Sequence, residues 1–302
     1  MPGLAQARVT ATLLLTAMVL AVACSGDDEP RPTIRAAGFN FSESHVLAWI
    51  YAIAFEDADF EVDTSRIQPG STREILKPAL EEDEIDYLPE YIGTLLSFLG
   101  GDPTGDSQSN YEAARARYAD TGIALLDYAP AQDQNAFVVT RAFAEERGIR
   151  SLTDLAPIAD ELTFGATPEC PERPFCAIGL REVYGIEFDE FIPLDARSRV
   201  GALQRGTIDV ALAFTTDASL ASNDWLVLED DQQLVPAENV ALAIRMNIVE
   251  AYGDELIELV AAISAELTTE ALSELNRQVQ VDGLDSEAAA RTWLQSNGLL
   301  AE

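Results

Sequence analysis

The chain has 302 residues, of which 48% are apolar, so it can bury a core and form two modest domains or one large one. Asp and Glu number 52 against 19 Lys and Arg, and the formal net charge is −33. Such a surface repels phosphate backbones and anionic headgroups, so we expect no nucleic-acid partner and take the acidity as a sign of solubility.

The N-terminus has the features of an export segment. Arg8 precedes an uncharged run over 9–23, which is shorter than the roughly 20 residues of a membrane span and suits a signal-peptide core. The run ends in Leu-Ala-Val-Ala before Cys24 and is similar to a bacterial lipobox. We predict a signal peptide over 1–23, then a lipidated Cys24 with a linker over 24–32. The alternative is plain secretion, or an uncleaved anchor with an incidental Cys.

Two further cysteines, Cys170 and Cys176, flank a segment rich in turn-forming residues. An exported protein meets an oxidising compartment, in which a disulfide persists. A metal site would need more Cys or His ligands, and His45 is the only histidine. A disulfide between Cys170 and Cys176 is therefore preferred, and no metal or cofactor is expected.

Short apolar runs alternate with helical patterns along the rest of the chain. The first set of expected elements, strand or helix in turn, is 33–37, a helix capped by Ser42, 62–67, 70–80, 85–88 and 89–98. The second set is 137–140, 151–158, 162–166, 178–184, 190–193, 200–204, 210–214 and 240–245, followed by helices over 248–267, 269–278 and 286–296. This rhythm predicts an α/β fold with largely parallel sheets.

Two α/β units of similar size predict two lobes with a cleft between them. Ligands of open parallel sheets lie beyond the carboxyl ends of the strands, at helix N-termini. Four segments then belong at the cleft: Asn40 to Ser44, Ser71 with Thr72, Tyr91 to Thr94, and Thr215 to Asp217. Backbone N–H groups there favour a carboxylate, and the ring of Tyr91 could hold a cation or be an ordinary half-buried aromatic.

The sequence offers little for catalysis. His45 lies among apolar residues without a nucleophile elbow, which favours a core or rim histidine over a catalyst. No P-loop, dinucleotide fingerprint or zinc spacing is present, and paired carboxylates are uninformative among 52 acids. We therefore expect that the protein is not an enzyme; an extracytoplasmic hydrolase is the disfavoured alternative.

Several dispersed segments resemble the substrate-binding proteins of glycine betaine/carnitine/choline ABC transporters. Residues 89–94, Pro-Glu-Tyr-Ile-Gly-Thr, are similar to the family's Pro-Glu-Tyr-Thr-Gly-Thr, and 40–44, Asn-Phe-Ser-Glu-Ser, to its Asn-Phe-Thr-Glu-Gln. Other similar segments follow in the family's order: 165–169 with Arg173 and Pro174, 213–217, 228–231 and 275–283. The likeness runs from about Thr33 to Leu300.

The resemblance implies a type II periplasmic-binding-protein fold with a hinge and an interlobe ligand cleft. Lobe 1 would hold 33–135 plus 241–302, and lobe 2 would hold 136–240. It also implies a monomer that delivers its solute to a membrane permease and an ATPase, at the outer face of the membrane or in the periplasm.

The resemblance also implies a ligand site. In the family, tyrosine side chains surround a quaternary ammonium group. Tyr91 matches one of these tyrosines, and the positions of the others fall at Asn135, Val200 and Glu238, none of which is aromatic. On the carboxylate side Thr94 is kept and Ser44 replaces Gln. Asn40, Thr216 and Asp217, from the segments already placed at the cleft, complete the expected ligand-binding residues. Glu238 either pairs with a cation that bears N–H donors or points to solvent.

These observations predict an exported, lipid-anchored solute-binding protein of an ABC importer. Its solute would be small and zwitterionic or cationic, with glycine betaine or choline as the leading candidates. The alternatives are a receptor for another amine-bearing solute, such as ergothioneine or an amino acid, and a sensory or scavenging lipoprotein that uses the same lobes without transport.

Overall fold

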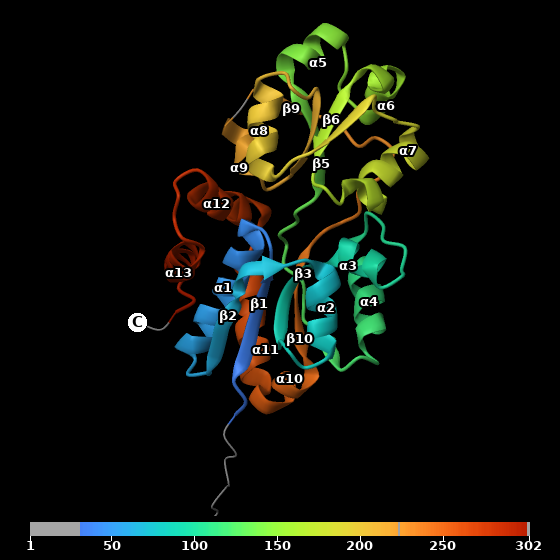
Figure 1. Cartoon of the computed structure of the whole chain (residues 1–302). Helices are drawn as coiled ribbons and strands as arrows, with labels where there is room; N and C mark the ends of the chain where they lie inside the picture. Colours follow the sequence, from blue (N-terminus) through green and yellow to red (C-terminus); the bar gives the residue numbers. More distant parts are fainter. Residues whose placement is uncertain (1–30, 223, 301–302) are drawn as a thin grey trace, which may run out of the picture. The chain divides into compact units, whose positions relative to one another are not determined.

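The computed structural model describes residues 31–222 and 224–300, which form two α/β units, each built on a five-stranded sheet (Figure 1). The strand order is β2-β1-β3-β10-β4 in the first sheet and β7-β6-β8-β5-β9 in the second. The predicted two-lobed α/β fold is confirmed. Signal peptide 1–23, Cys24 and most of the linker lie outside the described residues.

The first sheet is built mainly from the N-terminal third of the chain. Its strands are β1 (Ile34–Phe39), β2 (Val62–Ser71), β3 (Tyr87–Tyr91), β4 (Ile123–Leu125) and β10 (Val240–Arg245). Its helices are α1 (Ser42–Asp57), α2 (Arg73–Glu81), α3 (Ile92–Phe98), α4 (Ser107–Tyr118), α10 (Met246–Tyr252), α11 (Asp254–Glu266), α12 (Thr269–Gln280) and α13 (Ser286–Ser296).

The second sheet is built from the middle of the chain. Its strands are β5 (Asn135–Thr140), β6 (Thr163–Ala166), β7 (Glu190–Pro193), β8 (Val210–Phe214) and β9 (Trp225–Val227). Its helices are α5 (Arg141–Arg147), α6 (Leu152–Leu155), α7 (Gly179–Tyr184), α8 (Ala196–Gln204) and α9 (Ala218–Ser222), with short non-α turns over Ala156–Glu161, Cys170–Glu172 and Pro174–Ile178. The predicted lobe boundaries, 135/136 and 240/241, stay a prediction.

Both sheets are mixed, so the expectation of largely parallel sheets is wrong. β1 pairs in parallel with β2 and β3, but β10 runs antiparallel to β3 and β4. Likewise β6 is parallel to β7 and β8, whereas β5 is antiparallel to β8 and β9. The chain passes from one unit into the other just before β5 and again just before β10. β5 therefore starts at the edge of its sheet where β8 ends, and β10 starts at the edge where β1 and β3 end, so both strands run antiparallel to these neighbours.

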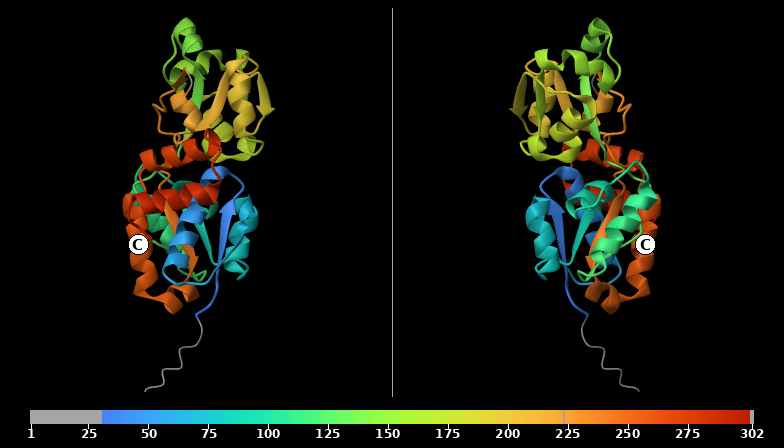
Figure 2. Two further views of the ribbon diagram at one scale, coloured as in Figure 1. Left: turned by 90° about the vertical axis from the view of Figure 1, so that its left-hand side faces the viewer. Right: turned by 90° about the vertical axis from the view of Figure 1, so that its right-hand side faces the viewer.

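Helix α1 organises the first core. It is apolar on nearly all sides, as expected for a helix buried within a domain, and 11 of its residues are buried. It contacts the sheet on one side and α11, α12 and α13 on the other. Helix α12 also contacts α9 of the second unit, and both views in Figure 2 place it where the two units meet.

Some predicted elements differ from the observed ones. Residues 89–91 belong to β3, so the helix begins only at Ile92. Ser42 does not cap α1: the N-cap is Phe41, whose side chain makes no cap hydrogen bond. The expected helix over 248–267 is split at Gly253, whose φ of +62° suits a residue without a Cβ. Helices α4, α5 and α9 and strands β4 and β9 were not predicted. None of the helices in the described part of the chain has the length and apolarity to cross a membrane.

Candidate functional site

The candidate site lies at the carboxyl ends of β1 and β3. Tyr91, the last residue of β3, is only 6% exposed, and its hydroxyl donates to Oε1 of Glu43 on the first turn of α1 at 2.6 Å. Burial and the adjacent Glu43 carboxylate raise the pKa of Tyr91 well above its usual value. Tyr91 is therefore a neutral donor that ties β3 to α1.

Glu238 contacts the first turn of α3. Its Oε2 accepts from the backbone N–H groups of Gly93 at 3.1 Å and Thr94 at 3.0 Å, and its Oε1 accepts from the Thr94 hydroxyl. A side chain at position 93 would not fit, because its Cβ would lie 2.6 Å from the carbonyl oxygen of Ala237. The alternative that Glu238 points to solvent is wrong, since the residue is 4% exposed. Burial raises its pKa to about 7 against the opposing effect of the Thr94 hydrogen bonds.

Glu43 connects the two units. Its Oε2 accepts from the Thr216 hydroxyl, directly after β8, at 2.6 Å, and from Nδ2 of Asn276 on α12 at 2.5 Å. The Thr216 hydroxyl also lies 2.8 Å from Oδ1 of Asp133, in the segment that leads into β5. Glu43, Thr216 and Asn276 are each no more than 4% exposed. Sequence reasoning named Thr216 as a site residue and placed segment 40–44 at the cleft, but did not single out Glu43 within that segment.

A buried ion pair supports β3. Arg73, the first residue of α2, donates to Glu90 at 2.7 Å, with side-chain exposures of 10% and 0%. The guanidinium carbon of Arg73 also lies 4.7 Å from the ring centroid of Phe39, which ends β1. A cation thus already occupies one aromatic face at this end of the sheet.

Three aromatic rings form a row beside this ion pair. The rings of Phe39 and Phe41 are stacked with centroids 6.0 Å apart, and those of Phe41 and Tyr91 are 6.1 Å apart. Phe39 and Tyr91 are buried, whereas Phe41 is 41% exposed. Phe41 is thus the exposed member of the aromatic row (Phe39, Phe41 and Tyr91). The sequence signal for it was present, because Phe41 adjoins Asn40 and the other residues of segment 40–44.

Ser44 and Asn40 both form hydrogen bonds with nearby backbone groups. The Ser44 hydroxyl is fully buried and accepts from the N–H of Phe39 at 2.8 Å. Asn40 is exposed, and its N–H donates to the carbonyl of Ser71 at 3.1 Å. The ring of His45 lies 3.2 Å from the carbonyl oxygen of Pro69, and its burial lowers its pKa. His45 is half-buried, as a rim histidine would be.

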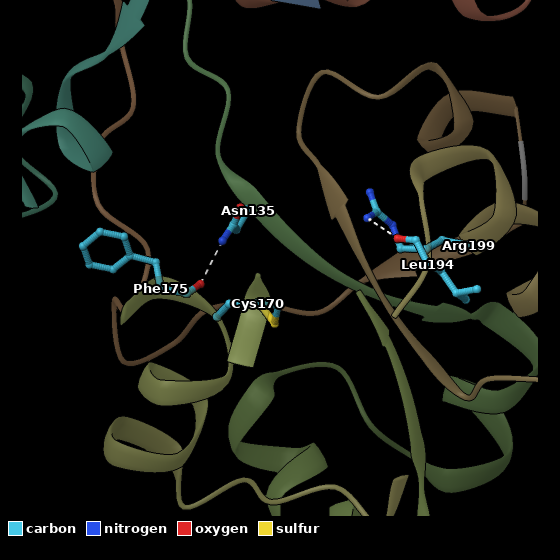
Figure 3. Close-up of a disulfide and its surroundings, with 6 residues drawn as sticks. Asn135, Cys170, Phe175, Leu194 and Arg199 are labelled. Atoms are coloured by element: carbon cyan, nitrogen blue, oxygen red, sulfur yellow. Dashed lines mark hydrogen bonds between the residues drawn. A yellow bond between two sulfur atoms is a disulfide. The ribbon is translucent and has the colours of Figure 1, made fainter. Parts of the chain in front are cut away.

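In the second unit, Asn135 donates from Nδ2 to the carbonyl of Phe175 at 2.8 Å (Figure 3). Phe175 belongs to a loop closed by a disulfide between Cys170 and Cys176, which the sequence predicted. The same loop carries Arg173, which pairs with Glu74 of α2 at 2.8 Å. The disulfide loop thus touches Asn135 and also the first unit.

Val200 and Asp217 line a small space in the second unit. Val200 and Arg199 of α8 line a water-sized space of about 10 Å³ with Asp217. Arg199 is 3% exposed and donates to the carbonyl of Leu194 at 3.3 Å (Figure 3). Asp217 accepts at Oδ2 from the N–H of Phe214, and burial raises the pKa of Asp217.

The structure brings some of the predicted site residues together. Thr216 is linked to Tyr91 through Glu43, while Tyr91 lies next to Thr94 and Glu238 at the start of α3. Among the residues that the structure describes, no hydrogen bond or ring contact joins Asn135 or Val200 to this group.

No group of three or more potential metal-ligating side chains occurs within residues 31–222 and 224–300. Within the same residues, the carboxyl ends of β1 and β3 carry acids, hydroxyls, aromatic rings and the Arg73 guanidinium, which is paired with Glu90. Such a set can bind a small polar cation or zwitterion through charge, hydrogen bonds and π faces.

Comparison with known families identifies this arrangement. A model of the substrate-binding domain of ABC-type glycine betaine transport systems matches residues 32–296. The chain belongs to this family. The prediction that it is not an enzyme is confirmed by this membership, because the family consists of solute-binding domains of ABC transporters.

The individual proteins that match the chain have low sequence identity to it. An ergothioneine transport permease/ergothioneine binding protein of Helicobacter pylori is 25% identical over 85% of this chain, which spans 46% of that relative's length. A glycine betaine-binding protein of Escherichia coli, YehZ, is 24% identical over 78% of this chain and 81% of its own. A crystal structure of a glycine betaine/carnitine/choline ABC transporter component superposes with a TM-score of 0.73 at 20% identity, over 88% of this chain and 99% of the other. That likeness supports the two-lobed fold.

Proposed function

We propose that this substrate-binding protein is an exported lipoprotein that captures a small cationic or zwitterionic solute between its two units and delivers it to an ABC permease and ATPase. The single observation that carries the ligand class is the exposure of Phe41. It lies in a row with Phe39 and Tyr91, next to buried carboxylates and an Arg73 cation that already sits on Phe39. A methylated ammonium group has no N–H donors and is held by aromatic faces.

The charge of the surroundings supports the same ligand class. Glu43, Glu90 and Glu238 lie within the segments that form the site, and Arg73 neutralises one of them. A positively charged solute is attracted to the surplus of negative charge, whereas an anion is repelled. Glycine betaine and choline are therefore the leading candidates.

A solute that bears N–H donors is the second candidate. The positions of the expected aromatic cage at Asn135 and Val200 are not aromatic, and Asn135 carries an amide that can accept from a donor. A relative named for ergothioneine binding and a relative named for glycine betaine binding match the chain at similar identity. Ergothioneine and amino acids therefore belong in the binding assay.

The cellular setting follows from the export segment. The signal peptide over 1–23 and a lipid on Cys24 would hold the protein at the extracytoplasmic face of a membrane, with the linker over 24–32 as tether. Metabolic labelling with a fatty acid tests this, because a Cys24→Ala variant should lose the label. We expect a monomer, which light scattering of the purified protein would check.

A thermal-shift panel tests the solute class. The mature protein is heated with glycine betaine, choline, carnitine, ergothioneine, amino acids and, as an anionic control, malate. A rise in Tm with at least one cationic or zwitterionic compound, and none with malate, is expected, because a solute that binds only the folded protein stabilises it. Stabilisation by malate alone would overturn the proposed ligand class.

A further inference from the structure

Two carboxylates face one hydroxyl group of the second unit. The Thr216 Oγ1 lies 2.6 Å from Oε2 of Glu43 and 2.8 Å from Oδ1 of Asp133. We name these three residues the carboxylate bridge. Glu43 starts α1 of the first unit, Thr216 follows β8 of the second, and Asp133 lies in the segment that connects them.

The number of protons in the carboxylate bridge decides how it can form. A threonine hydroxyl has one hydrogen and donates to one acceptor only. If both acids were ionised, one of the two short oxygen–oxygen contacts would have no hydrogen between the atoms and would be repulsive. Both contacts become hydrogen bonds only when one acid carries a proton and donates it to the Thr216 oxygen.

The surroundings place that proton on Asp133. Glu43 already accepts from the Tyr91 hydroxyl at Oε1 at 2.6 Å and from Asn276 at Oε2 at 2.5 Å, so both of its oxygens serve as acceptors. Among the described side chains, Thr216 lies within hydrogen-bond distance of Asp133. Burial and the charges of Glu43 and Asp217 raise the pKa of Asp133 well above the usual value, against the opposing effect of the hydrogen bonds from Thr216. Arg199 faces Asp217 and offsets part of that charge.

We propose that Glu43, Thr216 and protonated Asp133 are positioning residues that hold the two units of this receptor together in the arrangement of this structure, which we name the closed state, and that loss of the Asp133 proton opens it. This proposal rests on the two-unit fold and on the proposed capture of a solute between the units. It concerns the solute-free protein, so it can fail without affecting the ligand class.

The sign of the pH effect follows from linkage. The pKa of Asp133 is higher in the closed state than in an open state in which water surrounds the side chain. The closed state therefore binds the proton more tightly, and its stabilisation is complete below the usual carboxyl pKa of about 4. It declines as pH rises through the elevated pKa of the closed state. Closure is favoured by acid and lost in alkali.

Small-angle X-ray scattering of the solute-free mature protein at about pH 5 and about pH 9 tests this, since the compact chain has a radius of gyration of roughly 19 Å. We expect the radius to increase by on the order of 1 Å at the higher pH as the units separate about the hinge. Asp133→Asn carries an amide donor in place of the proton, and Glu43→Gln removes the other charge. Both variants should stay closed at both pH values.

Two controls separate the bridge from other contacts. Thr216→Val leaves the carboxylates without a shared hydroxyl and should be open at both pH values. Glu74→Gln removes the partly exposed pair with Arg173, which also joins the units, and should behave like the unmodified protein. Circular dichroism confirms that each variant is folded. The proposal is overturned if the unmodified protein keeps one radius at both pH values, or if folded Asp133→Asn still opens in alkali.

Discussion

The carboxylate of Glu238 lies against the first turn of α3, where it accepts a hydrogen bond from the backbone N–H of Thr94 at 3.0 Å. A carboxylate of the protein itself thus occupies the start of α3, although Glu238 lies 144 residues after Thr94 in the sequence. The backbone N–H groups of Gly93 and Thr94 already donate to this carboxylate, so Glu238 fixes the start of α3 and does not face water.

The stability of the protein should depend on pH through Glu238. Its pKa is about 7 in the folded state and about 4.5 when exposed, so the folded state binds more protons between these values. Stability from this group is complete below about pH 4.5 and declines by roughly 3 kcal/mol as pH rises through 7. Urea unfolding of Glu238→Gln should lack this decline. An equally steep decline in the variant would assign it to another group.

Loss of Arg73 should destabilise the protein strongly. Arg73→Met leaves Glu90, whose side chain is fully buried, without its cation, and removing one partner of a buried pair costs about 3–5 kcal/mol. Arg66→Met is the matched control, because the Arg66–Glu84 pair is about half exposed and should cost at most about 1 kcal/mol. Urea midpoints measure both. Equal losses would contradict the structural role assigned to the buried pair.

Phe41 should contribute to solute affinity. If a cation sits on its ring, Phe41→Ala removes one cation–π contact and weakens the best compound of the panel about three- to thirtyfold, while Phe41→Trp preserves it. Phe143→Ala is the control, since Phe143 is a half-buried aromatic of the second unit and already faces Arg147. Isothermal titration gives the affinities. Unchanged affinity in Phe41→Ala would place the solute elsewhere.

The disulfide should stabilise the second unit. Replacing both Cys170 and Cys176 by Ser frees a short loop in the unfolded chain and should cost about 2 kcal/mol, or about 4–8 °C in Tm. A reducing agent should lower the Tm of the unmodified protein to that of the double variant and leave the variant unchanged. A reductant-sensitive variant would show that the agent acts by another route.

Local patterns in the sequence were enough to predict much of the fold. Apolar runs such as 210–214 and 240–245 coincide with β8 and β10, because a buried strand needs a short continuous apolar stretch. Strand direction was not predictable in this way. β5 and β10 are antiparallel because the chain enters them from the other unit, and no local residue pattern encodes that.

The site was predictable where one segment carries several of its members. Tyr91 and Thr94 lie in residues 89–94, and Glu238 contacts the same turn. The partners of Glu43 were not predictable, because Thr216 and Asn276 are 173 and 233 residues away from it. Ser44 was expected to face the ligand, but its hydroxyl satisfies the N–H of Phe39 at the end of β1.

A crystal structure of the protein with the best compound of the panel tests the account most directly. The account predicts a solute in contact with residues of both units, with its cationic group against the ring of Phe41. A solute that touches only one unit, or one that leaves Phe41 facing water, would contradict it.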